Sequence, residues 1–243
     1  MTDSTAGAVP PASTSFWEDL IDIFFQPAAV FRRRATKSVW PPMLFVAIAV
    51  GVIFAATFNT IEPAFDAEFS RGMALAMSKN PQMTADMASK ARGFAELTAR
   101  FGAGLITFIS IFVIGCVTWV VAKLVGAKQT FNAALVVAAW SYMPRVVGAV
   151  LTAVEGLIMD PQSFTGMMSL SFSPARFMDP VKSNQLLYQL AGRFDLFTIW
   201  VTVLLAIGVY VTGKVSKDRA VIFGILMWVL GSLPALRQGF MAM

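Results

Sequence analysis

Five long runs of apolar residues restrict this chain more than any other feature of its sequence. A helix needs roughly 20 mostly apolar residues to cross a bilayer, and the runs have about that length. Apart from Asp195 at the start of one run, Arg145 is the only charged residue inside them. Backbone polar groups within a membrane must find partners inside their own segment, which favours helices. Transmembrane helices are therefore predicted at residues 40–61, 101–122, 131–154, 194–213 and 220–236.

Composition supports the same fold class, since 57% of the residues are hydrophobic and 14% are charged. Soluble domains carry roughly a quarter charged residues. We therefore predict an all-α polytopic integral membrane protein, a bundle of about five transmembrane helices over residues 40–240. Four spans are the alternative, because the last run is short and ends near Pro234 and Arg237.

The connections between the runs differ greatly in length. Those at residues 123–130 and 214–219 are so short that they predict antiparallel helical hairpins. The other two, 62–100 and 155–195, are each about forty residues long. Spaced methionines and good helix formers in 62–100 predict a helix at or above the membrane surface. Prolines, glycine and scattered serines in 155–195 predict mostly irregular structure.

Charge predicts the orientation, because Lys and Arg are retained on the cytoplasmic side. The N-terminal segment and the two short turns together hold nine Lys/Arg and five Asp/Glu, a net charge of +4. The opposite side holds nine of each. We expect the N-terminus in the cytoplasm and the C-terminus outside.

The segment before the first span predicts an amphipathic helix. Residues 1–15 resemble a disordered tail without a signal peptide. In 16–39, Trp17 and Phe24 share an apolar helical face, and Asp19 lies mostly on another, polar face. This helix is expected to lie in the membrane interface, with three arginines facing lipid phosphates. Packing on the cytoplasmic face of the bundle is the alternative. The predicted interface residues are Trp17, Phe24, Arg32, Arg33 and Arg34.

Several chemistries lack the residues that they need. The chain has no histidine and one cysteine, which excludes Ser-His-Asp and Cys-His arrangements and an HExxH zinc site. Basic residues flank the apolar runs, a placement typical of contact with lipid headgroups and not with nucleic acid. The 126–130 turn lacks the glycine spacing of a phosphate loop. We expect no enzymatic activity, no cofactor, no metal and no nucleotide or nucleic-acid partner.

Arg145 is the strongest candidate for a functional residue. A charged residue within a membrane span is by default functional and has a partner nearby, and Asp195 or Glu155 is the expected partner. Pro144 removes a backbone donor and should break the helix beside Tyr142. The alternative is a structural Arg145 that snorkels or locks helices together. Pro234 repeats the proline motif in the fifth span, which could place two kinked helices side by side.

Several motifs resemble the Yip-domain family of five-pass membrane proteins. They are the segment 22–27 leading to Phe31, the segment 131–135 running into Ser141-Tyr142-Met143-Pro144, and the closing helical hairpin. The short N-terminal segment is similar to prokaryotic members, which implies a cytoplasmic (inner) membrane location. The GTPase binding for which eukaryotic members are named is not carried over.

Two hypotheses for function follow. In the first, the protein is non-enzymatic and organises the lipid bilayer, other membrane proteins or copies of itself through its amphipathic helix and packing faces. In the second, it is a transporter or channel-like protein that uses kinked third and fifth helices around Arg145.

Overall fold

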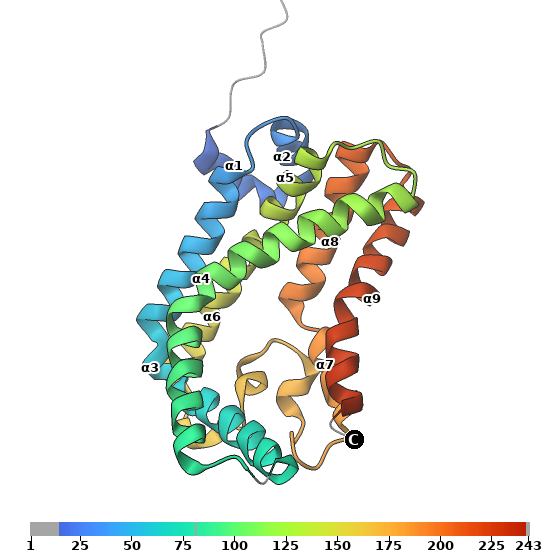
Figure 1. Cartoon of the computed structure of the whole chain (residues 1–243). Helices are drawn as coiled ribbons and strands as arrows, with labels where there is room; N and C mark the ends of the chain where they lie inside the picture. The colour runs from blue at the N-terminus through green and yellow to red at the C-terminus, as the bar shows by residue number, and fades with distance from the viewer. Residues whose placement is uncertain (1–14, 81, 242–243) are drawn as a thin grey trace, which may run out of the picture.

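The computed structural model describes residues 15–80 and 82–241, and this part of the chain is helical without a β-strand (Figure 1). The tail predicted at 1–15 lies outside the described residues, except for Ser15. The helices are α1 (Phe16–Phe25), α2 (Pro27–Arg34), α3 (Trp40–Lys79), α4 (Ala85–Leu124), α5 (Phe131–Ser141), α6 (Met143–Ile158), α7 (Gln185–Arg193), α8 (Leu196–Gly213) and α9 (Lys217–Met241), with short 3-10 helices η1 (Pro161–Ser163), η2 (Met167–Leu170) and η3 (Pro174–Phe177).

Five helical segments are long and apolar enough to cross a membrane: α3, α4, α5 with α6, α8 and α9. The prediction of an all-α polytopic membrane protein is therefore confirmed. In Figure 1, α1 and the end of α9 lie at opposite ends of the molecule. A chain that crosses a membrane an odd number of times has its two ends on opposite sides.

The third span consists of two helices, as the proline predicted. The α-helix breaks at Tyr142, and Pro144 occupies the first turn of α6, where its missing N–H removes no helical hydrogen bond. The nine residues 133–141 of α5 are all buried. Trp140 is 1% exposed, and its ring lies 5.5 Å from that of Phe16. The centre of the bundle is therefore α5, with the other elements packed around it.

The two long connections agree with their predictions only in part. Residues 62–100 are helical, but they form no separate surface helix: α3 runs on through Pro63 to Lys79, and α4 begins at Ala85. Arg92 clamps this extended hairpin by pairing with Asp66 at 2.8 Å and Glu62 at 3.1 Å. The connection 155–195 holds irregular and 3-10 structure, but it also contains α7, which the sequence did not predict.

The two short turns lie against each other at one end of the bundle. The backbone N–H of Lys128 donates to the carbonyl of Gly213 at 3.0 Å, and the Thr212 hydroxyl donates to the Gln129 side chain at 2.6 Å. Gly126 has a φ of 79°, a conformation that glycine adopts without strain. These bonds join the α4–α5 hairpin to the α8–α9 hairpin.

Candidate functional site

Arg145 projects from α6 toward the start of α8. Its Nη2 donates to the Thr198 hydroxyl at 2.8 Å, and its Nη1 lies 3.6 Å from the Asp195 carboxylate. The side chain of Asp195 is 13% exposed and that of Arg145 is 39% exposed. Of the two carboxylates that the sequence offered as partners, the structure brings Asp195 to Arg145.

Asp195 connects three elements at once. Its Oδ1 accepts hydrogen bonds from the Thr198 backbone at 2.9 Å and from the Thr198 hydroxyl at 3.1 Å, which caps the N-terminus of α8. Its Oδ2 accepts from the backbone N–H of Phe172 at 3.2 Å. The carboxylate therefore holds α8, the 155–195 connection and Arg145 in one arrangement.

Glu155 has a different partner. It pairs with Arg176 at 3.0 Å, and the guanidinium of Arg176 lies 5.7 Å from the centre of the Phe172 ring. This ion pair fastens the irregular connection to the end of α6. Glu155 thus binds the 155–195 connection through Arg176 and does not pair with Arg145.

Arg193, at the end of α7, is a residue of this site that the sequence analysis missed. Its Nε donates to the Ser232 hydroxyl at 3.2 Å, and its carbonyl accepts from the Trp228 indole at 3.2 Å. A Cβ at Gly231 would lie 2.9 Å from Nη2, so the glycine leaves room for the guanidinium. Burial, together with the positive charge of Arg145, lowers the pKa of Arg193. Its position two residues before Asp195 was the available signal.

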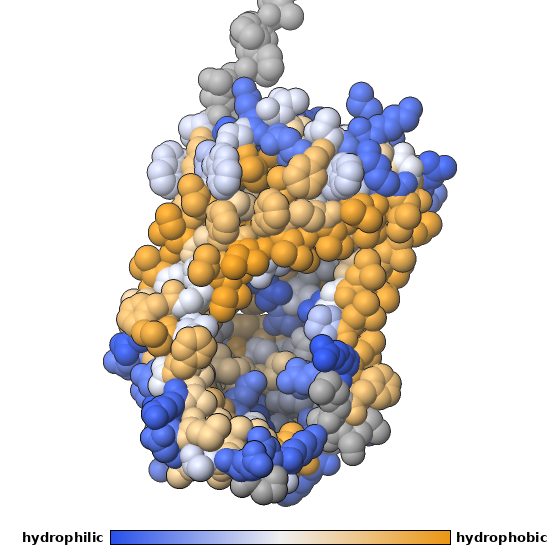
Figure 2. Space-filling model, viewed as in Figure 1, coloured by the Kyte–Doolittle hydropathy of each residue, from blue (hydrophilic) through white to orange (hydrophobic). Residues whose placement is uncertain are grey.

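A cavity of about 670 Å³ contains these charged groups. Figure 2 looks into a hollow below the apolar band of the surface, with hydrophilic residues inside it. Helices α3, α4, α6, α7 and α8 line the cavity together with η2, and Tyr142 also contributes. Two arginines and one carboxylate, Arg145, Arg193 and Asp195, give the lining a net positive charge. Guanidinium groups suit carboxylate or phosphate oxygens, so the cavity can hold an anion.

Pro234 lies apart from this cavity. It is exposed on α9, which packs against α7 and α8. The sequence suggested that the kinked third and fifth helices could lie side by side; in the structure α8 packs against both α6 and α9. The fifth helix reaches the site through Ser232 and its bond to Arg193. Pro144 is buried and lies in the chain between Tyr142 and Arg145, which both line the cavity.

The N-terminal helix is docked on the bundle, as in the alternative considered from the sequence. Asp19 was expected on the polar face, yet its carboxylate is 0% exposed and pairs with both Arg33 and Arg34. Arg33 also pairs with Asp22 at 2.6 Å. Because of these pairs, Arg33 and Arg34 do not face lipid phosphates freely, whereas Arg32 is exposed.

The outward face of α1 differs from the predicted apolar face. Phe24 packs against Trp200, with ring centres 5.5 Å apart. Trp17, Ile21 and Phe25 point outward, with exposed fractions of 68%, 64% and 79%. Their spacing of four residues places them on one stripe of the helix. The periodicity predicted an amphipathic helix but not which apolar side chains the bundle would cover.

The described residues contain no group of three or more His, Cys, Asp or Glu side chains placed to hold a metal ion.

The family model of the Yip1 domain matches residues 21–236. The chain is also similar to "Membrane protein YknW" of Bacillus subtilis (strain 168), at 25% identity over 216 residues, which cover 86% of each protein. No solved structure matches the chain significantly.

Proposed function

The chain belongs to the Yip1 domain family, and from that premise we propose that it is a non-enzymatic membrane protein that organises partner membrane proteins. The contact element in this proposal is α1. The observation that carries it is the stripe of Trp17, Ile21 and Phe25, which stays exposed while the face of the helix with Asp19 and Ile23 is buried.

The way in which α1 is fixed supports this role. A helix that only rested in lipid would not need a fully buried carboxylate, yet Asp19 is held between two arginines. Fixing the helix in advance reduces the ordering cost that binding must overcome. Aromatic side chains are also enriched where proteins contact one another. The stripe therefore has both the rigidity and the composition of a contact surface.

The test compares partners recovered from native membranes after chemical cross-linking. The variant W17A/I21A/F25A removes the stripe, and the matched control I48A/V52A removes apolar side chains of α3 that are each 61% exposed. We expect specific partners, quantified by mass spectrometry, to be lost with the first variant and retained with the control. Equal recovery from both variants, at equal membrane levels, would overturn the proposal.

The cavity supports a second candidate, a transporter for small anions. The supporting observation is that Arg145 and Arg193 line one cavity together. Proteoliposomes should then show chloride or phosphate flux that falls in R145Q and R193Q but not in R237Q, which changes an exposed arginine. Absence of flux for every small anion tested would reject this candidate without affecting the first. In both cases we propose an inner-membrane protein with a cytoplasmic N-terminus.

A further inference from the structure

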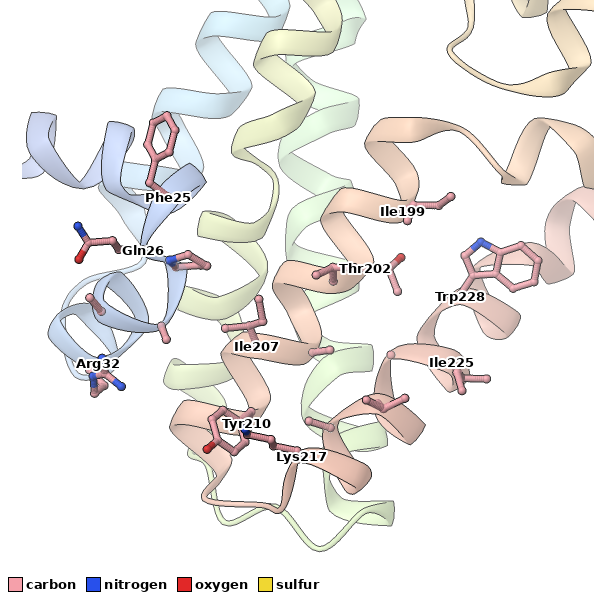
Figure 3. Close-up of a pocket in the computed structure, with 18 residues that line it drawn as sticks. Phe25, Gln26, Arg32, Ile199, Thr202, Ile207, Tyr210, Lys217, Ile225 and Trp228 are labelled. Atoms are coloured by element: carbon pink, nitrogen blue, oxygen red, sulfur yellow. The ribbon is translucent and has the colours of Figure 1, made fainter.

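A second, apolar groove of about 810 Å³ lies between α2, α8 and α9. Figure 3 shows α8 behind it, with side chains of α9 on one side and of the α1–α2 corner on the other. Small side chains leave this space unfilled although α8 and α9 already approach each other closely, since a Cβ at Gly224 would lie 3.3 Å from that of Ala206. Ala28, Ala29 and Ala220 also line it. The groove is therefore built into the packing of these helices.

Two cations stand at one end of the groove. Figure 3 places Arg32, Tyr210 and Lys217 at that end, with Trp228 and Ile199 at the other. Neither Arg32 nor Lys217 has an ion-pair partner among the described residues, although the neighbouring Arg33 is paired with Asp19 and Asp22. The charges of Arg32 and Lys217 are therefore available to a molecule bound in the groove.

The charged end of the groove coincides with the polar end of the bundle. Lys217 opens α9 just after the α8–α9 turn, and Arg32 belongs to α2, so both flank apolar spans. From Tyr210 to Ile199 the groove follows α8 over eleven residue steps, or about 16 Å at 1.5 Å per step. An occupant that fits has a negative group at the surface and an apolar chain along the helices.

We propose that this groove binds an anionic phospholipid, with its phosphate between Arg32 and Lys217 and one acyl chain against α8 and α9. The positive charges of Arg32 and Lys217 favour an anionic over a neutral phospholipid. Lys and Arg at a membrane surface attract anionic headgroups, and each cation contributes to that attraction. The walls between the charged end and Trp228 are nearly all apolar, and a soluble anion would leave them uncovered.

The test measures lipid binding to the purified full-length chain by native mass spectrometry, with phosphatidylglycerol and phosphatidylcholine as probes. The variant R32Q/K217Q removes the two cations. The control K37Q/K128Q removes two exposed lysines that do not line the groove. The variant V203W fills the apolar part, since Val203 is a half-exposed lining residue.

Wild type should bind phosphatidylglycerol in preference to phosphatidylcholine. R32Q/K217Q should weaken phosphatidylglycerol binding roughly tenfold or more, as expected for two surface cations, while K37Q/K128Q should leave it unchanged. V203W should lower the binding of both lipids. Equal affinity for the two lipids, unchanged binding by R32Q/K217Q, or full competition by glycerol phosphate without acyl chains would each overturn the proposal.

Discussion

Asp19 of α1 and Arg33 of α2 form an ion pair in which the carboxylate is completely buried. The same carboxylate also pairs with Arg34. Arg33 follows α1's last residue, Phe25, by eight positions, and the two helices fold back on each other across Gln26. The ion pair thereby fixes α1 to the segment that leads into the first span.

Replacing Asp19 with alanine should destabilise the protein by roughly 3 kcal/mol. Removing one partner of a buried pair leaves an uncompensated charge and costs about 3–5 kcal/mol, and the partial exposure of both arginines favours the lower end. Unfolding in detergent micelles measures the loss. The control D22A, whose carboxylate is 28% exposed, should cost about 1 kcal/mol or less. Equal losses would contradict the assignment.

Asp195 should show two separable contributions. D195N keeps a side-chain oxygen that can cap the Thr198 backbone N–H, but it loses the charge that faces Arg145. D195A loses both. We expect D195A to be less stable than D195N by about 1 kcal/mol, the usual worth of an N-cap. If the two variants unfold at the same temperature, the cap contributes nothing measurable.

Gly208 should not tolerate a side chain. A Cβ at this position of α8 would overlap the side chain of Val137 on α5. G208A should therefore lower the free energy of unfolding by about 1–3 kcal/mol, the usual cost of overpacking. G93A is the control, because nothing lies within 4 Å of a Cβ there, and it should stabilise α4 by about 0.5–1 kcal/mol. A neutral G208A would show that α5 and α8 can separate.

Labelling with a membrane-impermeant maleimide tests the proposed orientation. In a C116A background, a cysteine replacing Asn80, between α3 and α4, should react from outside intact cells. A cysteine replacing Lys128, between α4 and α5, should react only after the membrane is opened. Both positions are exposed, so the labelling depends on which side of the membrane the maleimide can reach. The reverse pattern would place the N-terminus outside.

The sequence predicted those parts of the fold that depend on local patterns. The apolar runs predicted the five membrane-crossing segments, and Pro144 predicted the break in the third. Both signals lie within a single segment and can therefore be recognised from the local sequence. The continuation of α3 beyond residue 61 was missed, since hydropathy marks where the bilayer ends and not where the helix ends. The helix formers after Glu62 carry it on to Lys79.

The candidate site was only partly predictable for a related reason. An unpaired Arg145 inside a span suggested a nearby carboxylate, and Asp195 was one of two choices. Arg193 was missed because its contact with Ser232 joins residues 39 positions apart, which no periodicity reports. The burial of Asp19 was missed for the same reason: its partners lie on the next helix, and amphipathic spacing alone assigned it to the polar face.

The two-part third span also has a consequence for how the protein enters the membrane. Of the five candidate spans it has the lowest mean hydropathy and the largest buried share, so protein and not lipid supplies most of its surroundings. Arg145 is synthesised about fifty residues before Asp195 and Thr198. During insertion this arginine therefore reaches the bilayer before its partners exist. Until α8 arrives, the guanidinium has to reach the membrane surface by snorkelling or find polar groups in the earlier spans.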